Sequence, residues 1–450
     1  MITIADRVTT SYIDRCVAGD RGLVHAMERA RARFPAALGR SCGARLLARP
    51  MFIAEAEMTA CADALMQIFD LLASLPERLF DGDFGRYCRA INIDPGRAAL
   101  IKRFPGPPTL YGRADMYHDG TSLKLLEYNT DSVIGGTERA EISRLLLEVD
   151  AFRDFAAEQE LNYVHTGDRV ARALRTAAEP VTGGEVPVVA LVERDGGLPA
   201  CMHLVLSFQE MMRRLGLDVV LGEISQLRSK AGRLYLHGKH IDVVLRYFGI
   251  EDITASAGAA EAAEPIFRAH EEGKVVLWTT MRSWQIFNKG CLALLSDNRS
   301  REVFSRQERN VIDNILPWTR RIIAGDRAVI EQCRGDRSAF VLKPYGGYGG
   351  VGVVAGWKVS DREWKEALLE AARHGGHVAQ RKVVPRNEPV VNPETGKVEP
   401  WSAVWDAYLT PDGYAGSRVR ALPAGDHGVI NMRSSSASRT AGVFCYPPRG

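Results

Sequence analysis

The chain has 450 residues, and 46% of them are hydrophobic, which is enough to bury a large core and form two or three lobes. The formal net charge is only +3 with 25% charged residues, so no basic stripe indicates a nucleic acid partner. No uninterrupted apolar run is long enough to cross a bilayer, and the first residues lack a signal-peptide pattern. The eight cysteines are scattered without zinc spacing. We therefore expect reduced thiols in a cytoplasmic protein with no membrane partner.

The first hundred residues are expected to be mainly helical. Residues 56–72 space their apolar side chains three and four apart, which is typical of an amphipathic helix. Nothing in this region indicates chemistry of its own. We interpret residues 1–100 as a helical region that caps the rest of the chain and helps to shape a substrate pocket.

The most informative stretch is a β-hairpin expected over residues 111–131. Two alternating runs flank an Asp-Gly turn. With the turn centred near Thr121, Asp115 lies opposite Glu127 and Arg113 lies opposite Asn129. The other face of this hairpin is expected to join a core through Ala114, Met116, Leu126 and Tyr128.

Two opposed carboxylates repel each other unless a positive group lies between them. Carboxylate and amide oxygens are ligands that Mg²⁺ uses together with substrate phosphates. The alternative is a solvated outer face that holds one arginine–aspartate pair. Composition does not separate these two interpretations, but the order of the residues favours the metal site.

The order Arg-x-Asp, followed by Leu-Leu-Glu-Tyr-Asn-x-Asp, resembles the glutathionylspermidine synthetase family. The resemblance implies a circularly permuted ATP-grasp ligase of mixed α+β and α/β class, in which this hairpin and the following helix (residues 101–160) hold magnesium ions. It implies Asp115, Glu127 and Asn129 as metal ligands and Arg113 as a phosphate or transition-state contact. The family continues with Asp-Thr-Pro after the asparagine, whereas Ser-Val-Ile-Gly-Gly follows Asp131 here. Since that segment borders the acceptor region, the substrate can differ from glutathione and spermidine.

A small α/β domain is expected over residues 161–275. Short β-branched runs occur at 186–192, 217–221 and 241–248, and a helical segment separates the first two. This order predicts a parallel sheet with right-handed crossovers. No glycine-rich phosphate loop follows the first run. In the resembled family this is a pre-ATP-grasp-like domain that supports the acceptor site.

Residues 276–450 are expected to form the nucleotide-binding lid and the C-terminal strands. Lys289 begins an apolar helix directly after Asn288. Helix starts disfavour cations, so an anion partner is plausible there, and a solvated surface lysine is the alternative. The surrounding residues resemble the first ATP-contacting lysine of the permuted ATP-grasp family.

A glycine-rich turn follows Lys343, between a strand at 340–343 and a return strand at 351–354. Glycine N–H groups can approach phosphate oxygens closely because no Cβ intervenes. Dinucleotide and kinase loops fit less well, because a strand follows the turn and the lysine precedes it. We expect a lid over ATP, as in ATP-grasp ligases, and a ligand-free glycine hairpin is the alternative. The expected ATP contacts in this lid are Lys343, Gly346, Gly347, Gly349 and Gly350.

A capping box at 360–363 predicts a helix over 364–373, and a glycine turn is the expected reason for the two histidines that follow it. Gln380 then lies on a strand that resembles the family's hinge beside the nucleotide. Two later strands, 401–408 and 413–420, are joined by a clear turn. Arg418 and Arg420 share a face. The Ala-Gly-x-x-x-Arg order resembles that of the family's arginine, which implies Arg420 as a phosphate contact, and a surface salt bridge is the alternative for either arginine. The polar segment 427–444 either binds an anionic group or forms a tail.

The resemblance covers about residues 105–440 and implies an ATP-dependent ligase that joins a carboxylate to an amine through an acyl phosphate. It implies ATP and Mg²⁺ as cofactors and small-molecule carboxylate and amine substrates, and it leaves a homodimer open. Two alternatives are a ligase that modifies a ribosomal peptide or protein and a non-catalytic nucleotide-binding scaffold. The intact set of Arg113, Asp115, Glu127 and Asn129 argues against the scaffold, because a dead site is free to lose ligands that repel each other.

Overall fold

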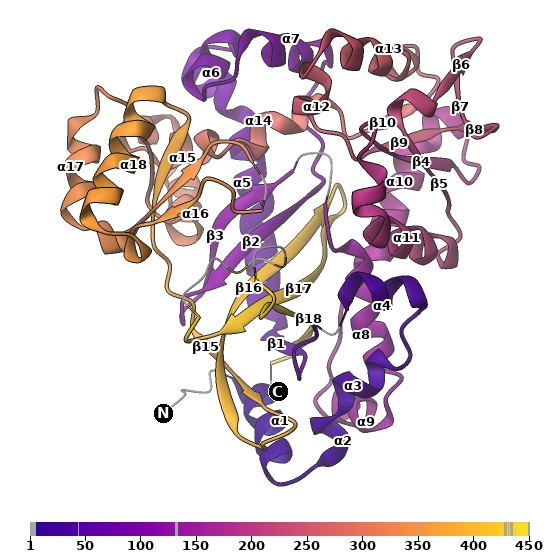
Figure 1. Ribbon diagram of the computed structural model, residues 1–450, viewed down its shortest axis with the longest axis vertical. Coiled ribbons are helices and arrows are strands. Elements are labelled where there is room, and N and C mark those ends of the chain that lie inside the picture. The colour runs from indigo at the N-terminus through magenta and orange to yellow at the C-terminus, as the bar shows by residue number, and fades with distance from the viewer. Residues whose placement is uncertain are drawn as a thin grey trace.

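A central β-sheet organises the molecule, with an α/β unit on one side and a second unit of helices and a small sheet on the other (Figure 1). The computed structural model describes residues 6–43, 45–130, 134–347, 349–426, 430, 432 and 435–448. Short helices near the N-terminus cover the lower end of the sheet in this view.

Helices dominate the first hundred residues, although one strand interrupts them. The helix predicted over 56–72 is confirmed and is longer, because α5 runs from Glu55 to Phe80. It packs its apolar side, which includes Met58, Leu65 and Leu72, against the core of the central sheet. The elements of this region are α1 (Arg7–Val17), α2 (Arg21–Val24), α3 (Ala26–Arg31), α4 (Ala36–Cys42), β1 (Met51–Ala54), α5 (Glu55–Phe80), α6 (Phe84–Ala90) and α7 (Pro95–Arg103).

By length and composition alone, α5 could cross a membrane, and it is the single such helix among the described residues. Core helices pass the same test. Its buried residues belong to the large hydrophobic core that the central sheet also lines, so the packing accounts for its apolar character.

The central sheet has seven strands, in the order β1-β18-β17-β16-β2-β3, and β15 also pairs with β16. All pairs are antiparallel except β1 with β18, which run parallel. The sheet therefore joins segments from near both ends of the chain. Besides β1, its strands are β2 (Gly112–His118), β3 (Leu123–Asn129), β15 (Asn387–Val391), β16 (Val398–Thr410), β17 (Gly413–Pro423) and β18 (Arg439–Tyr446).

The predicted hairpin forms, and the predicted register is confirmed at the end that carries the charged residues. Asp115 pairs with Glu127, and Arg113 pairs with Asn129. Beyond Asp115 a bulge shifts the register, so that Met116 faces Leu125. The core placement predicted for Leu126 is therefore wrong: Leu125 is fully buried instead, beside Ala114, Met116 and Tyr128, while Leu126 is only half-buried.

Two helices follow the hairpin, α8 (Ala140–Leu146) and α9 (Asp150–Glu158), and the α/β unit comes next. Its predicted parallel sheet is confirmed, with the order β10-β9-β4-β5. A separate three-stranded sheet, β6-β7-β8, is attached to it. The elements of this unit are α10 (Thr166–Thr182), β4 (Val188–Glu193), α11 (Leu198–Arg214), β5 (Asp218–Glu223), β6 (Arg228–Lys230), β7 (Arg233–Leu236), β8 (Lys239–Ile241), β9 (Val243–Arg246), α12 (Ile250–Thr254), α13 (Ala257–Glu271) and β10 (Val276–Trp278).

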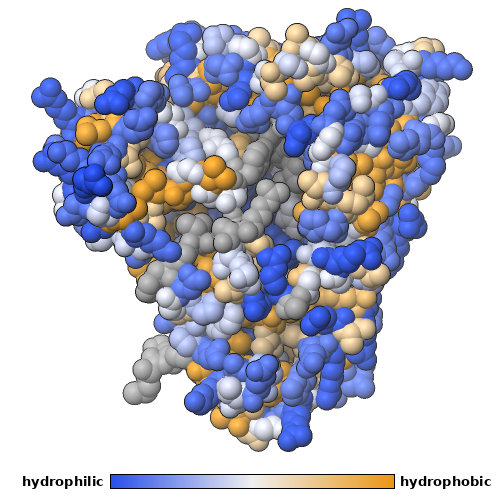
Figure 2. Space-filling model, viewed as in Figure 1, coloured by the Kyte–Doolittle hydropathy of each residue, from blue (hydrophilic) through white to orange (hydrophobic). Residues whose placement is uncertain are grey.

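The remaining unit carries a four-stranded sheet in the order β11-β14-β12-β13. Hydrophilic side chains cover most of its outer edge, over α17 and α18 (Figure 2). Ser360 and Glu363 form the predicted capping box at the start of α18. The return strand predicted at 351–354 is displaced, because β13 is limited to residues 354–355. The elements are α14 (Trp284–Phe287), α15 (Lys289–Ser296), α16 (Arg306–Ile315), β11 (Thr319–Arg321), α17 (Arg327–Gly335), β12 (Phe340–Pro344), β13 (Val354–Ala355), α18 (Asp361–His374) and β14 (His377–Arg381).

Candidate active site

A row of charged residues crosses four neighbouring strands of the central sheet. The register places Glu127 of β3 opposite Asp115 of β2, Asp115 opposite Asp406 of β16, and Asp406 opposite Arg418 of β17. Side chains alternate between the two faces of a strand. The apolar residues of β2 and β3 therefore enter the core, while this row lies on the other face.

Asp115 is held between two guanidinium groups. Arg113 donates from Nε to Oδ1 over 2.6 Å and from Nη2 to Oδ2 over 3.0 Å, and Arg420 donates from Nη2 to Oδ2 over 2.7 Å. The Asp115 side chain is only 6% exposed. Burial raises the pKa of the carboxyl group, but Arg113 and Arg420 outweigh burial and hold the pKa of Asp115 well below its usual range. Asp115 is therefore ionised, and both of its oxygens have partners.

Asp406 is the second carboxylate of this network, and the sequence analysis missed it. Its side chain is fully buried. It accepts hydrogen bonds from Arg418 Nε at 2.9 Å and from Arg420 Nε and Nη2 at 2.9 and 2.6 Å. The signal in the sequence was a lone carboxylate inside an otherwise apolar strand, Ala-Val-Trp-Asp-Ala-Tyr-Leu. Such a residue needs a cation beside it.

Burial and neighbouring charges shift the pKa values of two arginines of the network in opposite directions. Burial alone would lower the pKa of Arg420, but Asp406 and Asp115 raise it above its usual value. For Arg418, burial prevails and lowers the pKa. Arg418 also donates from Nη2 to the carbonyl oxygen of Gly135 at 3.3 Å, an oxygen that accepts from Arg113 Nη1 at 2.9 Å as well. The salt bridge that was the alternative for Arg420 does form, inside the molecule rather than on its surface.

Two lysines lie at the edge of the same row of charged residues. They come from the unit that carries the sheet β11-β14-β12-β13, which we call the lid unit. Lys289, the first residue of α15, is 6% exposed and lies with Nζ 3.4 Å from Glu127 Oε2. Lys343 of β12 donates to Gln380 Oε1 at 2.8 Å and to the carbonyl oxygen of Leu126 at 3.2 Å. That carbonyl belongs to the bulge of the hairpin, so the bulge supplies an acceptor to the lysine. The structure thus brings Lys289, Lys343, Gln380 and Glu127 together.

Lys343 has an altered proton affinity. Burial lowers its pKa to about 8, although Glu127 acts in the opposite direction and Lys289 adds to the lowering. A lysine whose charge is poorly solvated gains most from an anion that arrives beside it. This environment is suited to a phosphate group.

The glycine-rich turn begins beside Lys289. The Lys289 backbone N–H donates to the carbonyl oxygen of Tyr345 at 2.8 Å, which ties the start of the turn to α15. Gly347, Gly349 and Gly350 have φ values of 107°, 68° and 80°, which other residues rarely adopt. Gly346 lies near Trp284, since a Cβ on it would be 3.7 Å from Cζ2 of the indole. The turn therefore begins beside the start of α15, and backbone conformation accounts for Gly347, Gly349 and Gly350.

The hairpin partly fits a magnesium ion. Glu127 is 30% exposed at its side chain and has one long ion pair with Lys289. Among the described residues, the Asn129 Nδ2 atom is buried without a hydrogen-bond partner, so the orientation of this amide is not fixed through its nitrogen. The carboxylate oxygens of Glu127 and the amide oxygen of Asn129 are ligands that suit Mg²⁺. Asp115 would need one of its arginines to move. Among the described residues, no three histidine, cysteine, aspartate or glutamate side chains are grouped to hold a metal, so a metal here would draw on the Asn129 amide.

The row and the two lysines beside it contain five cations, which are three arginines and two lysines. They contain three anions, which are Asp115, Glu127 and Asp406. The excess of two positive charges favours a polyanionic ligand. Two segments discussed from the sequence, Asp131 with its neighbours and most of residues 427–434, lie outside the described residues.

Comparison with known proteins finds similarity to solved structures. No protein-family model matches the chain, and no curated protein matches it. Among solved structures, a glutathione synthetase-like effector from Globodera pallida in its apo form is similar, with a TM-score of 0.55 and 12% identity over 94% of this chain and 97% of that chain. A candidate γ-glutamylcysteine synthetase from Methylobacillus flagellatus KT gives a TM-score of 0.43 and 13% identity, over 83% of this chain and 87% of that chain.

The first likeness shows the fold. The chain has the mixed α/β fold of that glutathione synthetase-like effector, and the predicted mixed α/β class is confirmed.

Proposed function

We propose that this protein is an ATP-dependent ligase that joins a small carboxylate substrate to an amine, as the resemblance to the glutathionylspermidine synthetase family implies. ATP would lie between the central sheet and the lid unit, over Lys289 and Lys343. The observation that carries the proposal is the convergence of Lys289, Lys343 and Glu127, which come from α15, β12 and β3.

The chemistry is phosphoryl transfer followed by acyl transfer. A carboxylate oxygen of the first substrate attacks the γ-phosphorus of ATP, and the bond from that phosphorus to the ADP oxygen breaks. The amine nitrogen then attacks the acyl carbon, phosphate leaves, and the nitrogen loses a proton. Such catalysis depends mainly on placement and on neutralising charge. Lys289 and Lys343 would neutralise the phosphates, and Arg113 and Arg420 would face the transferred group.

The metal would be held by Glu127 and Asn129, with Asp115 joining when an arginine releases it. When bound, Mg²⁺ would supply positive charge that offsets the negative charge of the phosphates. Lys289 would exchange its long contact with Glu127 for a phosphate oxygen. Gln380 would keep the Lys343 ammonium directed toward the same space.

A second candidate function is non-catalytic nucleotide binding. The observation that favours it is the saturation of Asp115, whose two oxygens already accept from Arg113 and Arg420. An arginine-locked carboxylate holds a metal weakly unless the network rearranges.

The experiment that tests the proposal measures ADP release from ATP and Mg²⁺ with pools of amino acids, short peptides and polyamines. Mass spectrometry of the reaction identifies any coupled product. Turnover with one pool would support the ligase and give its substrate class. ATP binding without turnover in every pool would favour the non-catalytic function or a ligase for a ribosomal peptide, which a pull-down of a peptide partner would distinguish. No ATP binding at all would refute the proposal.

A further inference from the structure

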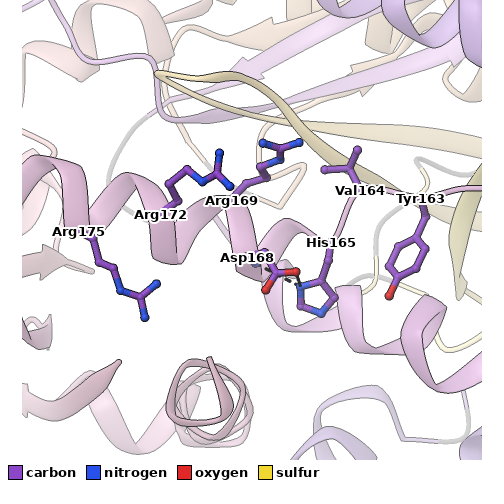
Figure 3. A pocket seen from close by; sticks show the side chains of 7 residues that line it. All are labelled: Tyr163, Val164, His165, Asp168, Arg169, Arg172 and Arg175. Carbon is purple, nitrogen blue, oxygen red and sulfur yellow. Dashed lines mark hydrogen bonds and ion pairs between the residues drawn. The ribbon is translucent and has the colours of Figure 1, made fainter. Parts of the chain in front are cut away.

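A cavity of about 640 Å³ lies beside α10, and none of the candidate active-site residues lines it (Figure 3). Tyr163, Val164 and His165 lead into the helix at one end of the cavity. Asp168, Arg169, Arg172 and Arg175 line the rest of it from the helix itself. One short stretch of chain thus supplies a wall with three guanidinium groups.

Glu141 is a buried carboxylate near the cavity, but it does not neutralise these arginines, because it is already paired with other side chains. Glu141 accepts from Arg144 at 2.8 Å, lies 2.8 Å from His165 Nε2, and pairs with Arg214. His165 Nδ1 accepts from the backbone N–H of Asp168 at 3.2 Å, and its Nε2 lies 2.8 Å from Glu141 Oε1. Among the described residues that line the cavity, Asp168 is the only acidic one.

The guanidinium groups of Arg169 and Arg172 have no hydrogen bond or ion pair within the described part of the chain. Figure 3 shows both side chains extending to the same side of α10, whereas Arg175 extends to the other. Arg175 donates from Nη2 to the carbonyl oxygen of Leu215 at 2.7 Å, which accounts for its orientation. Like charges three residues apart on a helix destabilise it. The pair Arg169 and Arg172 is thus unfavourable in isolation and would be relieved by an anion.

The charge of the cavity wall selects the anion. Arg169 and Arg172 place two positive charges on the same side of α10. A carboxylate has two oxygens, which a single guanidinium fork can satisfy, whereas a phosphate presents three terminal oxygens and up to two charges to two forks at once. The helix N-terminus does not supply the site, because the Asp168 N–H is already bonded to His165.

We propose that this cavity binds a dianionic phosphate group, which Arg169 and Arg172 hold together. Tyr163 lies at the other end of the cavity, where its ring would pack against an organic remainder of the ligand. The phosphate comes either as free inorganic phosphate or as a phosphate monoester. This inference does not depend on the proposed ligase activity.

The test is calorimetric titration of the full chain with inorganic phosphate and with phenyl phosphate, at constant ionic strength. The variant R169Q/R172Q removes both guanidinium groups, and R29Q/R31Q removes the same charge from exposed, unpaired positions of α3. We expect phosphate affinity to fall at least about tenfold in R169Q/R172Q and to stay unchanged in R29Q/R31Q. Should the double variant fail to fold, the single variant R172Q alters an exposed residue and carries the same expectation.

The two ligands separate the sources of the phosphate. Tighter binding of phenyl phosphate, lost in Tyr163→Ala, would indicate a phosphate monoester, and equal binding would indicate free phosphate. Absence of binding for both probes, or equal binding by R169Q/R172Q and the unaltered protein, would overturn the proposal.

Discussion

Asp406 lies directly opposite Asp115 in the register of β16 and β2, and one guanidinium group, that of Arg420, donates to both carboxylates. Two buried carboxylates on adjacent strands would repel each other strongly without such a bridge. The network also fixes the directions of Arg113 and Arg418, which meet at the carbonyl oxygen of Gly135. Asp406 therefore positions the arginines of the candidate active site without belonging to the hairpin.

Replacing Asp406 with asparagine should destabilise the protein. The amide would leave Arg418 and Arg420 without their buried counter-charge, and breaking a buried ion pair from one side costs about 3–5 kcal/mol. Urea denaturation of the Asp406→Asn variant measures this loss. The exposed pair of Asp313 with Arg301 provides the control, since Asp313→Asn should change stability by less than about 1 kcal/mol. Equal effects of the two substitutions would contradict the positioning role.

ATP affinity should depend on pH through Lys343. Its pKa is lowered to about 8, so the ammonium is charged below that pH and becomes neutral above it. A bound phosphate favours the charged form, and affinity should therefore be level at lower pH and fall as pH rises through 8 and beyond. Displacement of a fluorescent ATP analogue measures the profile. The Lys343→Arg variant keeps its charge and should show a flatter profile, whereas an unchanged decline would assign the titration to another group.

Glu127→Gln should leave a folded protein with much slower ADP formation. The substitution keeps the shape of the side chain but removes the charge that pairs with Lys289 and that, in the proposed function, would hold a metal. Losing a charge that acts on the transition state lowers the rate by about 10²–10³. A coupled ADP assay measures the rate, and Glu179→Gln, an exposed change at the end of α10, should retain activity. Retained activity in Glu127→Gln would exclude the hairpin as the metal site.

The Asn129→Ala variant should need more Mg²⁺ for activity, with little change in the stability of the protein. Among the described residues, the Nδ2 atom of Asn129 has no hydrogen-bond partner, so loss of the amide should change the free energy of unfolding by less than about 1 kcal/mol. The same loss removes one oxygen ligand and should raise the Mg²⁺ concentration needed for half-maximal ADP formation. A large loss of stability with an unchanged Mg²⁺ requirement would mean that Asn129 is structural.

Gly136→Ala should disturb Arg418. Gly136 has a φ of 94°, and an added Cβ would overlap the guanidinium group of Arg418. Both the strained backbone and the displaced arginine oppose folding, with an expected loss of about 1 kcal/mol or more in thermal or chemical denaturation. Gly135→Ala is the matched control, because a Cβ there meets nothing within 4 Å. Comparable stability of the two variants would show that the space near Arg418 relaxes freely.

Local patterns predicted much of this molecule. The alternation around an Asp-Gly turn was sufficient to pair Asp115 with Glu127, because hairpin register depends on neighbouring residues. The bulge after Asp115 was not predictable in that way. An extra residue in one strand leaves no mark in the alternation until the partner strand is known, and it moved Leu125 rather than Leu126 into the core.

Other features of the fold and the site could not be predicted, because they depend on pairing between segments far apart in the sequence. Asp406 lies almost three hundred residues from Asp115 in the chain, and nothing in either strand specifies that they will be neighbours. The strand β1 was hidden for the same reason, since four residues between helices carry too weak a pattern to stand out. The lysines were found because a helix start and a glycine turn are local features, but their meeting at Glu127 required the folded chain.

The parallel pairing of β1 with β18 has a consequence for how the protein is made. During synthesis, residues 51–54 leave the ribosome long before residues 439–446, their partner strand. Until then, β1 and the outer edge of β17 present unpaired backbone groups that can join other chains. We therefore expect the sheet to close late and slowly, and nascent or C-terminally truncated chains to depend on chaperones to stay apart.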